Sequence, residues 1–287
     1  MRKFLLSSVL CFCLGAAWIA QAQQPMLTPP KVLVIGREVL KTGKAAVHEK
    51  WEAGWPRAFA KAKSPTHYIA ASSLTGEGRV LFLAGFDSMA AWEKDNQFNS
   101  QNAALSAELA VLAEKDGDYL TENRTAVFTY MPELSYNADT IPVAGARYFL
   151  IYSVEVKPGH GDHFVATRKL AREAHEKAGL TDHYAVYHLA AGRSSGLYLI
   201  FVPMKSLAEM DQFPAMHGKA YQDALGEDGQ KKMDDFAAQG AESIEPQLFV
   251  FSPKMSYVSK EWMDADPDFW KPAPAAKPAA KKAPPSQ

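Results

Sequence analysis

The chain has little cysteine, no excess of either charge, and few of the short signatures that mark a known chemistry. Its 287 residues include two cysteines, and the formal net charge at pH 7 is −1. This balance gives no indication of a nucleic-acid partner, and an apolar content of 47% is typical of a globular protein. The H-E-x-x-H, Walker A and Rossmann glycine patterns are absent from the sequence.

A targeting segment occupies the N-terminus and contains both cysteines. Arg2 and Lys3 precede a largely apolar run over residues 4–20, and Ala20-Gln21-Ala22 fits the small-x-small cleavage pattern. We therefore predict a signal peptide over residues 1–22 and an exported protein, periplasmic or extracellular, without stable membrane insertion after cleavage. The alternative is an uncleaved membrane anchor. Cleavage removes both cysteines, which excludes disulfides, thiolate metal ligands and a cysteine nucleophile.

Segments of distinct composition flank the globular part. Residues 23–30 form a proline-rich lead-in. Trp262 and Trp270 follow the last expected strand, so we interpret residues 259–270 as a hydrophobic latch that folds back onto the body, with a partner-docking motif as the alternative. Residues 271–287 contain mainly proline, alanine and lysine and predict a disordered tail. The lysines of this tail could contact an anionic envelope surface, or the tail is simply solvated.

The globular part contains an internal repeat. An offset of 116 residues aligns Lys41-Thr42-Gly43-Lys44 with Lys157-Pro158-Gly159-His160, His67-Tyr68 with His183-Tyr184, and Leu81-Phe82-Leu83 with Leu197-Tyr198-Leu199. The alignment then slips by two residues, and the motif F-x-[YF]-x-P-x-x-S-Y recurs at 128–136 and 249–257. Because the matches keep the same order, we predict two copies of one unit, at 31–140 and 146–258.

Each copy shows the same order of strand and helix signals. A strand and a helix precede two strands joined by a glycine turn, then helical sequence and a final strand, which is the βαββαβ order of the ferredoxin-like unit. The strands near 80–86 and 197–202 are apolar on both faces, whereas helices in this topology cover only one face. We therefore predict an α+β fold in which two ferredoxin-like repeats pack as an intrachain pseudo-dimeric α/β barrel.

This duplicated pattern resembles the dimeric α/β-barrel superfamily in a fused, tandem form. The superfamily includes antibiotic-biosynthesis-type monooxygenases, NIPSNAP-like proteins and chlorite-dismutase-like haem enzymes. The resemblance spans residues 31–258 and rests on topology and duplication. It implies a small ligand, a haem or an aromatic substrate held between sheets and helices, and it transfers no catalytic residue to this chain.

Two histidines that recur in the repeat are candidate ligand-binding residues. His67 and His183 start the strand after the first helix of each copy, and Tyr187 shares a strand face with His183. Such a pair could hold a ligand or act as a general base. The alternative is that the duplication copied a structural histidine.

The first helix of copy one carries a second group of candidates. Trp51 and Trp55 lie four residues apart within an expected helix at 44–62, and His48 is on the same helix. Repeat 2 lacks both tryptophans, so a single pocket in copy one is possible, opened where Pro56 breaks the helix. The alternative is that these aromatic residues are core. We expect His67 to be the nearest polar candidate.

No metal site and no cofactor are assigned. His160 and His163 lie three residues apart at an expected helix start, but no third ligand joins them, and a solvated helix terminus explains them. A haem would need an axial ligand, for which His48, His175 and His217 are candidates, and nothing in the sequence selects among them.

Three functions are consistent with these patterns. The first is an exported protein that binds a small, partly apolar molecule in a barrel pocket. The second is a cofactor-independent or haem-dependent oxygenase-type enzyme on the same fold. The third is a structural or interaction protein of the envelope. Fold alone does not choose among them, because one fold supports unrelated functions.

Overall fold

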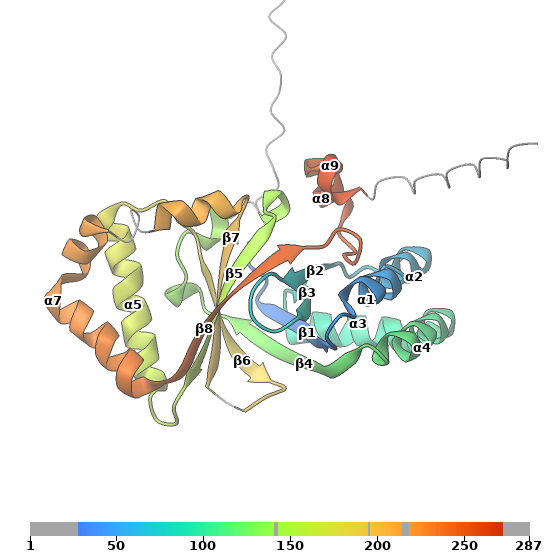
Figure 1. The fold of residues 1–287 in the computed structure, drawn as a ribbon, viewed down its shortest axis with the longest axis horizontal. Helices are drawn as coiled ribbons and strands as arrows, with labels where there is room; N and C mark the ends of the chain where they lie inside the picture. The colour runs from blue at the N-terminus through green and yellow to red at the C-terminus, as the bar shows by residue number, and fades with distance from the viewer. Residues whose placement is uncertain (1–27, 141–142, 195, 214–217, 272–287) are drawn as a thin grey trace, which may run out of the picture.

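The computed structural model describes residues 28–140, 143–194, 196–213 and 218–271. The predicted signal peptide, most of the proline-rich lead-in and all but the first residue of the predicted tail lie outside these ranges. The described part contains eight strands that close into one antiparallel barrel (Figure 1). Within the described residues, no helix is long and apolar enough to cross a bilayer.

The first repeat supplies four strands and four helices. They are β1 (Val32–Leu40), α1 (Ala45–Glu52), α2 (Trp55–Ala62), β2 (Tyr68–Ser73), β3 (Arg79–Phe86), α3 (Met89–Gln101), α4 (Ala103–Gly117) and β4 (Leu120–Tyr130). Short 3-10 turns at Pro132–Leu134, Ala138–Thr140 and Val143–Gly145 lead to the second repeat.

The second repeat follows the same order and is followed by two short helices. Its elements are β5 (Tyr148–Val156), α5 (Gly161–Ala178), β6 (Ala185–Ala191), β7 (Leu197–Met204), a 3-10 segment (Leu207–Gln212), α7 (Lys219–Asp235), a π-helical turn (Phe236–Gly240) and β8 (Ala241–Phe251). The chain then forms α8 (Lys260–Ala265) and α9 (Pro267–Trp270).

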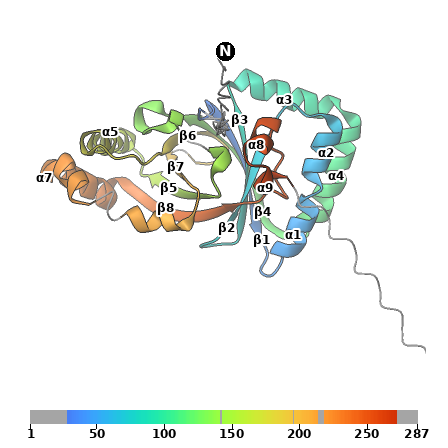
Figure 2. The same ribbon diagram turned by 90° about the horizontal axis from the view of Figure 1, so that it is seen from above.

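The strand order confirms the predicted pseudo-dimeric barrel. Each repeat forms a four-stranded sheet, β4-β1-β3-β2 in the first and β8-β5-β7-β6 in the second, which is the ferredoxin-like order. Antiparallel pairing of β2 with β8 and of β4 with β6 joins the two sheets and leaves no free edge. Figures 1 and 2 show α1 to α4 on one side of the barrel and α5 with α7 on the opposite side.

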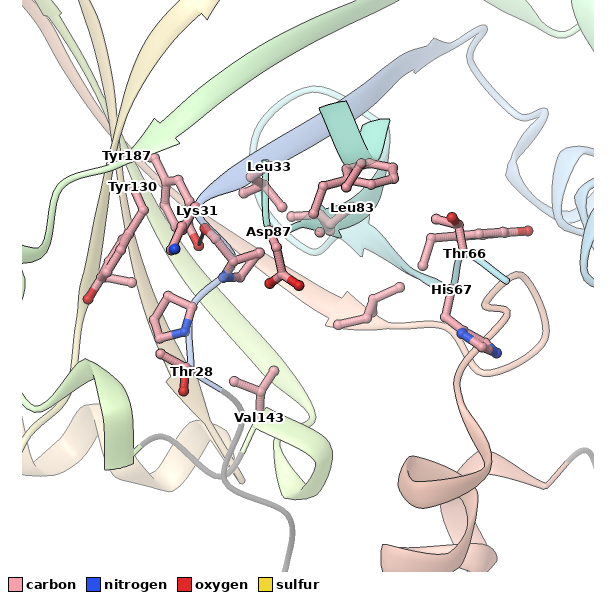
Figure 3. Close-up of a pocket in the computed structure, with 18 of the residues that line it drawn as sticks. Thr28, Lys31, Leu33, Thr66, His67, Leu83, Asp87, Tyr130, Val143 and Tyr187 are labelled. Carbon is pink, nitrogen blue, oxygen red and sulfur yellow. Dashed lines mark hydrogen bonds between the residues drawn. The ribbon is translucent and has the colours of Figure 1, made fainter. Parts of the chain in front are cut away.

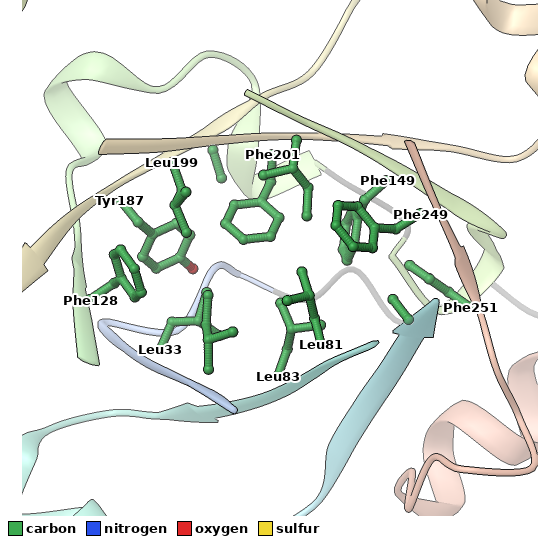
Figure 4. Close-up of a cluster of buried hydrophobic side chains, with 14 of the residues drawn as sticks. Leu33, Leu81, Leu83, Phe128, Phe149, Tyr187, Leu199, Phe201, Phe249 and Phe251 are labelled. Carbon is green, nitrogen blue, oxygen red and sulfur yellow. The ribbon is translucent and has the colours of Figure 1, made fainter. Parts of the chain in front are cut away.

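The two apolar faces of strand β1 have different partners, as predicted. Alternate side chains such as Leu33 and Ile35 point into the barrel and pack with aromatic and aliphatic residues of the other repeat (Figure 4). The intervening Val32 and Val34 pack outside the barrel against Trp92 of α3. The barrel interior is therefore a shared hydrophobic core.

The pairing register corrects the sequence alignment at one strand. Val32 pairs with Phe86, whereas the equivalent Tyr148 pairs with Met204, so the repeats are offset by 116 residues at β1 and β5 but by 118 at β3 and β7. The two extra residues lie in the turn between β6 and β7, ahead of the position where the sequence matches placed them. The alignment of Leu81 with Leu197 was wrong by two residues for this reason.

The first helix of repeat 1 also differs from the prediction. A break was expected at Pro56, but α1 ends at Glu52, and Ala53 and Gly54 separate it from α2. Pro56 lies in the first turn of α2, where its missing N–H has no intrahelical partner to lose. The break therefore precedes the proline.

Residues 259–270 pack onto the barrel. Trp262 and Trp270 are buried, and the Trp270 indole nitrogen donates a hydrogen bond of 2.8 Å to the Ala144 carbonyl oxygen. An ion pair between Arg147 and Asp266 adds a second attachment. The two short helices therefore lie beside one end of the barrel, where they help to form the cavity described next.

Candidate functional site

A cavity of about 1070 Å³ lies at the end of the barrel where β1 and β5 begin. Figure 3 shows labelled residues from both repeats arranged around this space. Its apolar lining includes Leu33, Ile69, Leu83, Phe86, Val143, Phe149, Ala185, Phe201, Val258 and Trp262. This volume is slightly above the roughly 300–1,000 Å³ that is typical of small-molecule sites.

The repeat places this cavity on a pseudo-two-fold axis. Leu33 of β1 corresponds to Phe149 of β5, Leu83 corresponds to Phe201, and Ile69 corresponds to Ala185. All of these residues line the cavity. Because equivalent strands begin at the same end of the barrel, the axis runs along the barrel. The two-fold operation therefore maps this cavity onto itself and does not generate a second copy.

Two tyrosines give the cavity a polar wall. The Tyr187 hydroxyl donates a hydrogen bond of 3.1 Å to the Pro30 carbonyl oxygen, and its ring centroid lies 5.4 Å from that of Tyr130. Burial raises the pKa of Tyr187, with the nearby Tyr130 adding to the effect, so the hydroxyl stays protonated and acts as a donor.

His67 lies on the opposite wall, beside the α8 segment. Its ring stacks on Tyr257 at a centroid distance of 4.7 Å. Burial lowers the pKa of His67, which outweighs the opposing effect of Glu261. The imidazole is therefore mainly neutral at pH 7 and can accept a proton from a bound molecule.

A second site lies outside the barrel, between the sheet of repeat 1 and its helices. Glu38 of β1, His48 and Glu52 of α1, and Asp116 of α4 are between 1% and 8% exposed. One potential ligand atom from each of the four lies within 4.8 Å of the others. We call these four residues the His48 cluster. A cavity of about 320 Å³ adjoins it.

The contacts of the His48 cluster centre on the imidazole. Nδ1 of His48 is 2.8 Å from Oδ1 of Asp116, and Nε2 is 3.6 Å from Oε2 of Glu38. Asn123 donates a hydrogen bond of 3.0 Å to the other oxygen of Glu38. The imidazole therefore lies between two carboxylates.

Burial and mutual repulsion change the acidity of two carboxyls in this cluster. Desolvation raises the pKa of Glu38 to about 7, with Asp116 adding to the shift and His48 opposing it. Desolvation likewise raises the pKa of Glu52 to about 9, with Glu38 and Asp116 adding and the Trp55 indole opposing. Like charges held together in a poorly solvated space account for both directions.

Repeat 2 has a cavity of about 400 Å³ in the corresponding space between sheet and helices. The Phe164 ring stacks on Tyr198 at a centroid distance of 4.0 Å. His175 contacts the Ala171 carbonyl oxygen at 2.6 Å through Nδ1 and Asp182 at 3.1 Å through Nε2. Both nitrogens of this histidine are thus engaged by protein atoms.

The structure separates the residues that the sequence suggested for binding. His67 and Tyr187 line the barrel-mouth cavity. His48 belongs to the His48 cluster, and Trp55 lines the cavity beside it.

The remaining two candidates lie elsewhere. Trp51 is half-buried on α1 and lines none of these three cavities, and Nδ1 of His183 is 3.1 Å from the Asn137 carbonyl oxygen, also away from them. The polar groups nearest Trp55 are thus Glu52 and its cluster, not His67.

Sequence reasoning missed Glu38 and Asp116 as parts of a site. A comparison of the two repeats could have indicated this site, since Glu38 aligns with Val154 and His48 aligns with Phe164. A glutamate and a histidine that replace apolar residues at buried repeat positions mark a local specialisation.

One segment of the sequence matches a catalytic motif, and its place in the fold shows whether the match is meaningful. Residues 192–196 read G-x-S-x-G, the pattern of a hydrolase nucleophile elbow. The segment here joins the antiparallel strands β6 and β7, whereas the elbow requires a turn from a strand into a helix. The match, whose serine is Ser194, is therefore a hairpin turn.

No family model matches the chain, and no curated protein matches its sequence. Among solved structures, the chain is similar to a candidate monooxygenase from Fusobacterium nucleatum, with a TM-score of 0.50, 12% identity, and coverage of 78% of this chain and 94% of that one. This likeness shows a shared fold.

Weaker likenesses concern two further structures. An anthrone oxidase-like protein gives a TM-score of 0.49 at 12% identity, over 82% of this chain and 98% of that chain. A mutant chlorite dismutase of Candidatus Nitrospira defluvii in complex with cyanide gives 0.47 at 11% identity, over 84% of this chain and 97% of that chain.

Proposed function

We propose that this chain is an exported protein that binds one small, mainly apolar molecule at the barrel mouth. The observation that supports this most strongly is the cavity of about 1070 Å³ at the junction of the repeats. The apolar wall supplies hydrophobic contact, and Tyr130, Tyr187 and His67 supply a few hydrogen-bonding groups that would orient a ligand.

A fluorescence titration with 8-anilinonaphthalene-1-sulfonate tests this site. We expect saturable binding that a library of small apolar compounds displaces. Ile69→Trp fills the cavity from β2 and should weaken binding at least tenfold. The control Val111→Trp adds the same ring on the exposed face of α4. Equal binding by both variants would place the probe elsewhere and overturn the proposal.

The export part of the proposal rests on the sequence of residues 1–22. Sequencing the N-terminus of protein recovered from the periplasm or medium should give a chain that begins near Gln23. Recovery of the intact N-terminus from cytoplasm alone would contradict export.

An oxygenase-type activity is the second candidate, and His67 favours it. A mainly neutral imidazole in the wall of an apolar cavity could remove a proton from a bound phenol, the first step by which a substrate is activated toward oxygen. Oxygen uptake with a panel of hydroquinones, compared between the wild type and His67→Gln, tests this. Absence of uptake by the wild type would eliminate this candidate.

Haem does not fit two of the three histidines that the sequence offered as axial ligands, His48 and His175. Both nitrogens of His175 contact protein oxygens. The space beside His48 is about 320 Å³ and is lined by carboxylates, which an apolar macrocycle would bury without partners. His217 lies outside the described residues. The proposed function therefore assigns no axial ligand and does not depend on haem.

A further inference from the structure

The His48 cluster contains buried polar atoms that no described residue satisfies. Nε2 of His48, Oε2 of Glu38 and Oδ2 of Asp116 lack a hydrogen-bond partner. An unpartnered buried polar atom costs about 1–3 kcal/mol, and a charged one costs more. Three such atoms in one cluster indicate that a bound group completes it.

The imidazole is held as in a metal site. If Nδ1 of His48 donates its proton to Asp116 at 2.8 Å, Nε2 keeps its lone pair for a metal ion. Nε2 and Oε2 of Glu38 are 3.6 Å apart, which is too far for a hydrogen bond. Two ligand atoms bound tetrahedrally to one ion at about 2.1 Å lie roughly 3.4 Å apart. The observed separation therefore suits an ion between them.

The second repeat shows that packing alone does not require this cluster. It has Val154, Phe164 and Arg168 where the first repeat has Glu38, His48 and Glu52. Phe164 stacks on Tyr198 and contacts Phe236 at a ring-centroid distance of 5.6 Å. The position of His48 is thus filled by an aromatic side chain in the second copy, and Glu38 and Glu52 have no acidic counterparts there. Ionised carboxylates held together in a buried space are destabilising without a counter-ion, which a bound cation would supply.

The cluster is accessible to an ion. The adjoining cavity of about 320 Å³ is lined by Glu38, Glu52 and Asp116 together with Trp55 and Thr121. It provides a route for entry and room for water or a small anion as a further ligand.

We propose that the His48 cluster binds one divalent first-row transition-metal ion. The ligands are Nε2 of His48, Oε2 of Glu38 and the carboxylate of Glu52, and Asp116 orients the imidazole. An imidazole nitrogen combined with carboxylate oxygens suits ions such as Mn²⁺, Fe²⁺ or Zn²⁺, whereas Ca²⁺ and Mg²⁺ prefer sets made of oxygen alone. This site is separate from the barrel mouth.

Calorimetric titration of the chelator-treated protein with Mn²⁺ and Zn²⁺ tests the proposal, with the visible spectrum of added Co²⁺ as a direct report of coordination. We expect one ion per chain. The double variant Glu38→Val with His48→Phe copies the side chains of repeat 2, so it should fold, and it should lose at least 100-fold in affinity. Circular dichroism checks that the variant is folded.

A second variant separates the positioning role of Asp116 from ligation. Asp116→Asn should weaken binding about 10- to 100-fold, the range expected when the partner of a metal-bound histidine is lost. Glu114→Gln, exposed on the same helix, should bind as the wild type does. The proposal is overturned if the wild type binds no transition metal, if it binds only Ca²⁺ or Mg²⁺, or if the double variant binds as tightly as the wild type.

Discussion

His48 and Phe164 occupy equivalent positions in the two repeats. The difference between these two residues gives the position a different role in each repeat. Phe164 is 1% exposed and belongs to an aromatic cluster. His48 is equally buried but lies between Glu38 and Asp116. Phe164 contributes packing to repeat 2. His48 instead lies among carboxylates of repeat 1, whose negative charge needs a partner.

The pKa of Glu52 leads to a prediction about pH. Burial raises this pKa from 4.5 to about 9. Between these values the folded chain holds a proton that the unfolded chain releases, so the free energy of unfolding should fall as the pH rises from 5 to 8 in chelator. Glu52→Gln removes the larger part of this loss, because Glu38, with its pKa raised to about 7, contributes the smaller part. The variant should stabilise the chelated protein at pH 8 by about 1–3 kcal/mol, measured by urea unfolding.

A control variant and a second measurement with bound metal make this prediction specific to Glu52. Glu114→Gln should leave the slope with pH unchanged, since Glu114 is exposed. In saturating Mn²⁺, Glu52→Gln should lower Tm, because it removes a ligand. If Glu52→Gln destabilised the protein by a similar amount in chelator and in Mn²⁺, the result would contradict the account and indicate that Glu52 has a purely structural role.

Tyr187 carries a prediction at the barrel mouth. Its hydroxyl donates to the Pro30 carbonyl oxygen at 3.1 Å, so Tyr187→Phe should destabilise the fold by about 1 kcal/mol. For a domain of this length, that corresponds to a fall in Tm of about 2–4 °C by calorimetry. An unchanged Tm would show that the hydrogen bond contributes nothing.

At the scale of elements, α8 and α9 lie beside one end of the barrel. Their sequence, rich in aromatic residues, follows β8 after the repeat is complete. Trp270 is 2% exposed and forms an edge contact with Trp262 at 5.4 Å between ring centroids. Because Trp262 also lines the barrel-mouth cavity, these helices link core packing to the proposed binding site.

Trp270→Ala measures how much this segment contributes. Loss of a fully buried tryptophan should lower the free energy of unfolding by about 3–5 kcal/mol in chemical denaturation. Leu207→Ala, at a residue that is 41% exposed, is the matched large-to-small control and should change it by less than about 1 kcal/mol. Equal effects of the two would mean that α9 packs only loosely.

At the scale of the molecule, neither repeat has a complete core. The inner face of β1 to β4 is covered by the inner face of β5 to β8, and β2 and β4 pair with β8 and β6. A fragment of residues 28–137 should therefore form a dimer, with two copies rebuilding the barrel. Sedimentation equilibrium tests this, and a stable, folded monomer would contradict it.

The barrel was predictable because its signals are local and repeated. The recurring histidine-tyrosine pair and the two-faced apolar strands are sufficient to place two sheets against each other. The His48 cluster was not predicted, because Glu38, His48 and Asp116 come from three separate elements. Their proximity depends on the register between β1 and β4 and on how α1 and α4 cover the sheet. Neither is encoded in any short motif.

The stoichiometry of binding at the barrel mouth is the most direct measurement of the central claim. The cavity lies on the pseudo-two-fold axis, so the repeat does not duplicate it within the chain. For the tightest compound that displaces the fluorescent probe, calorimetry should give one molecule per chain, and Ile69→Trp should bind that compound at least tenfold more weakly. Two equivalent molecules per chain, or a titration that Ile69→Trp leaves unchanged, would contradict the account.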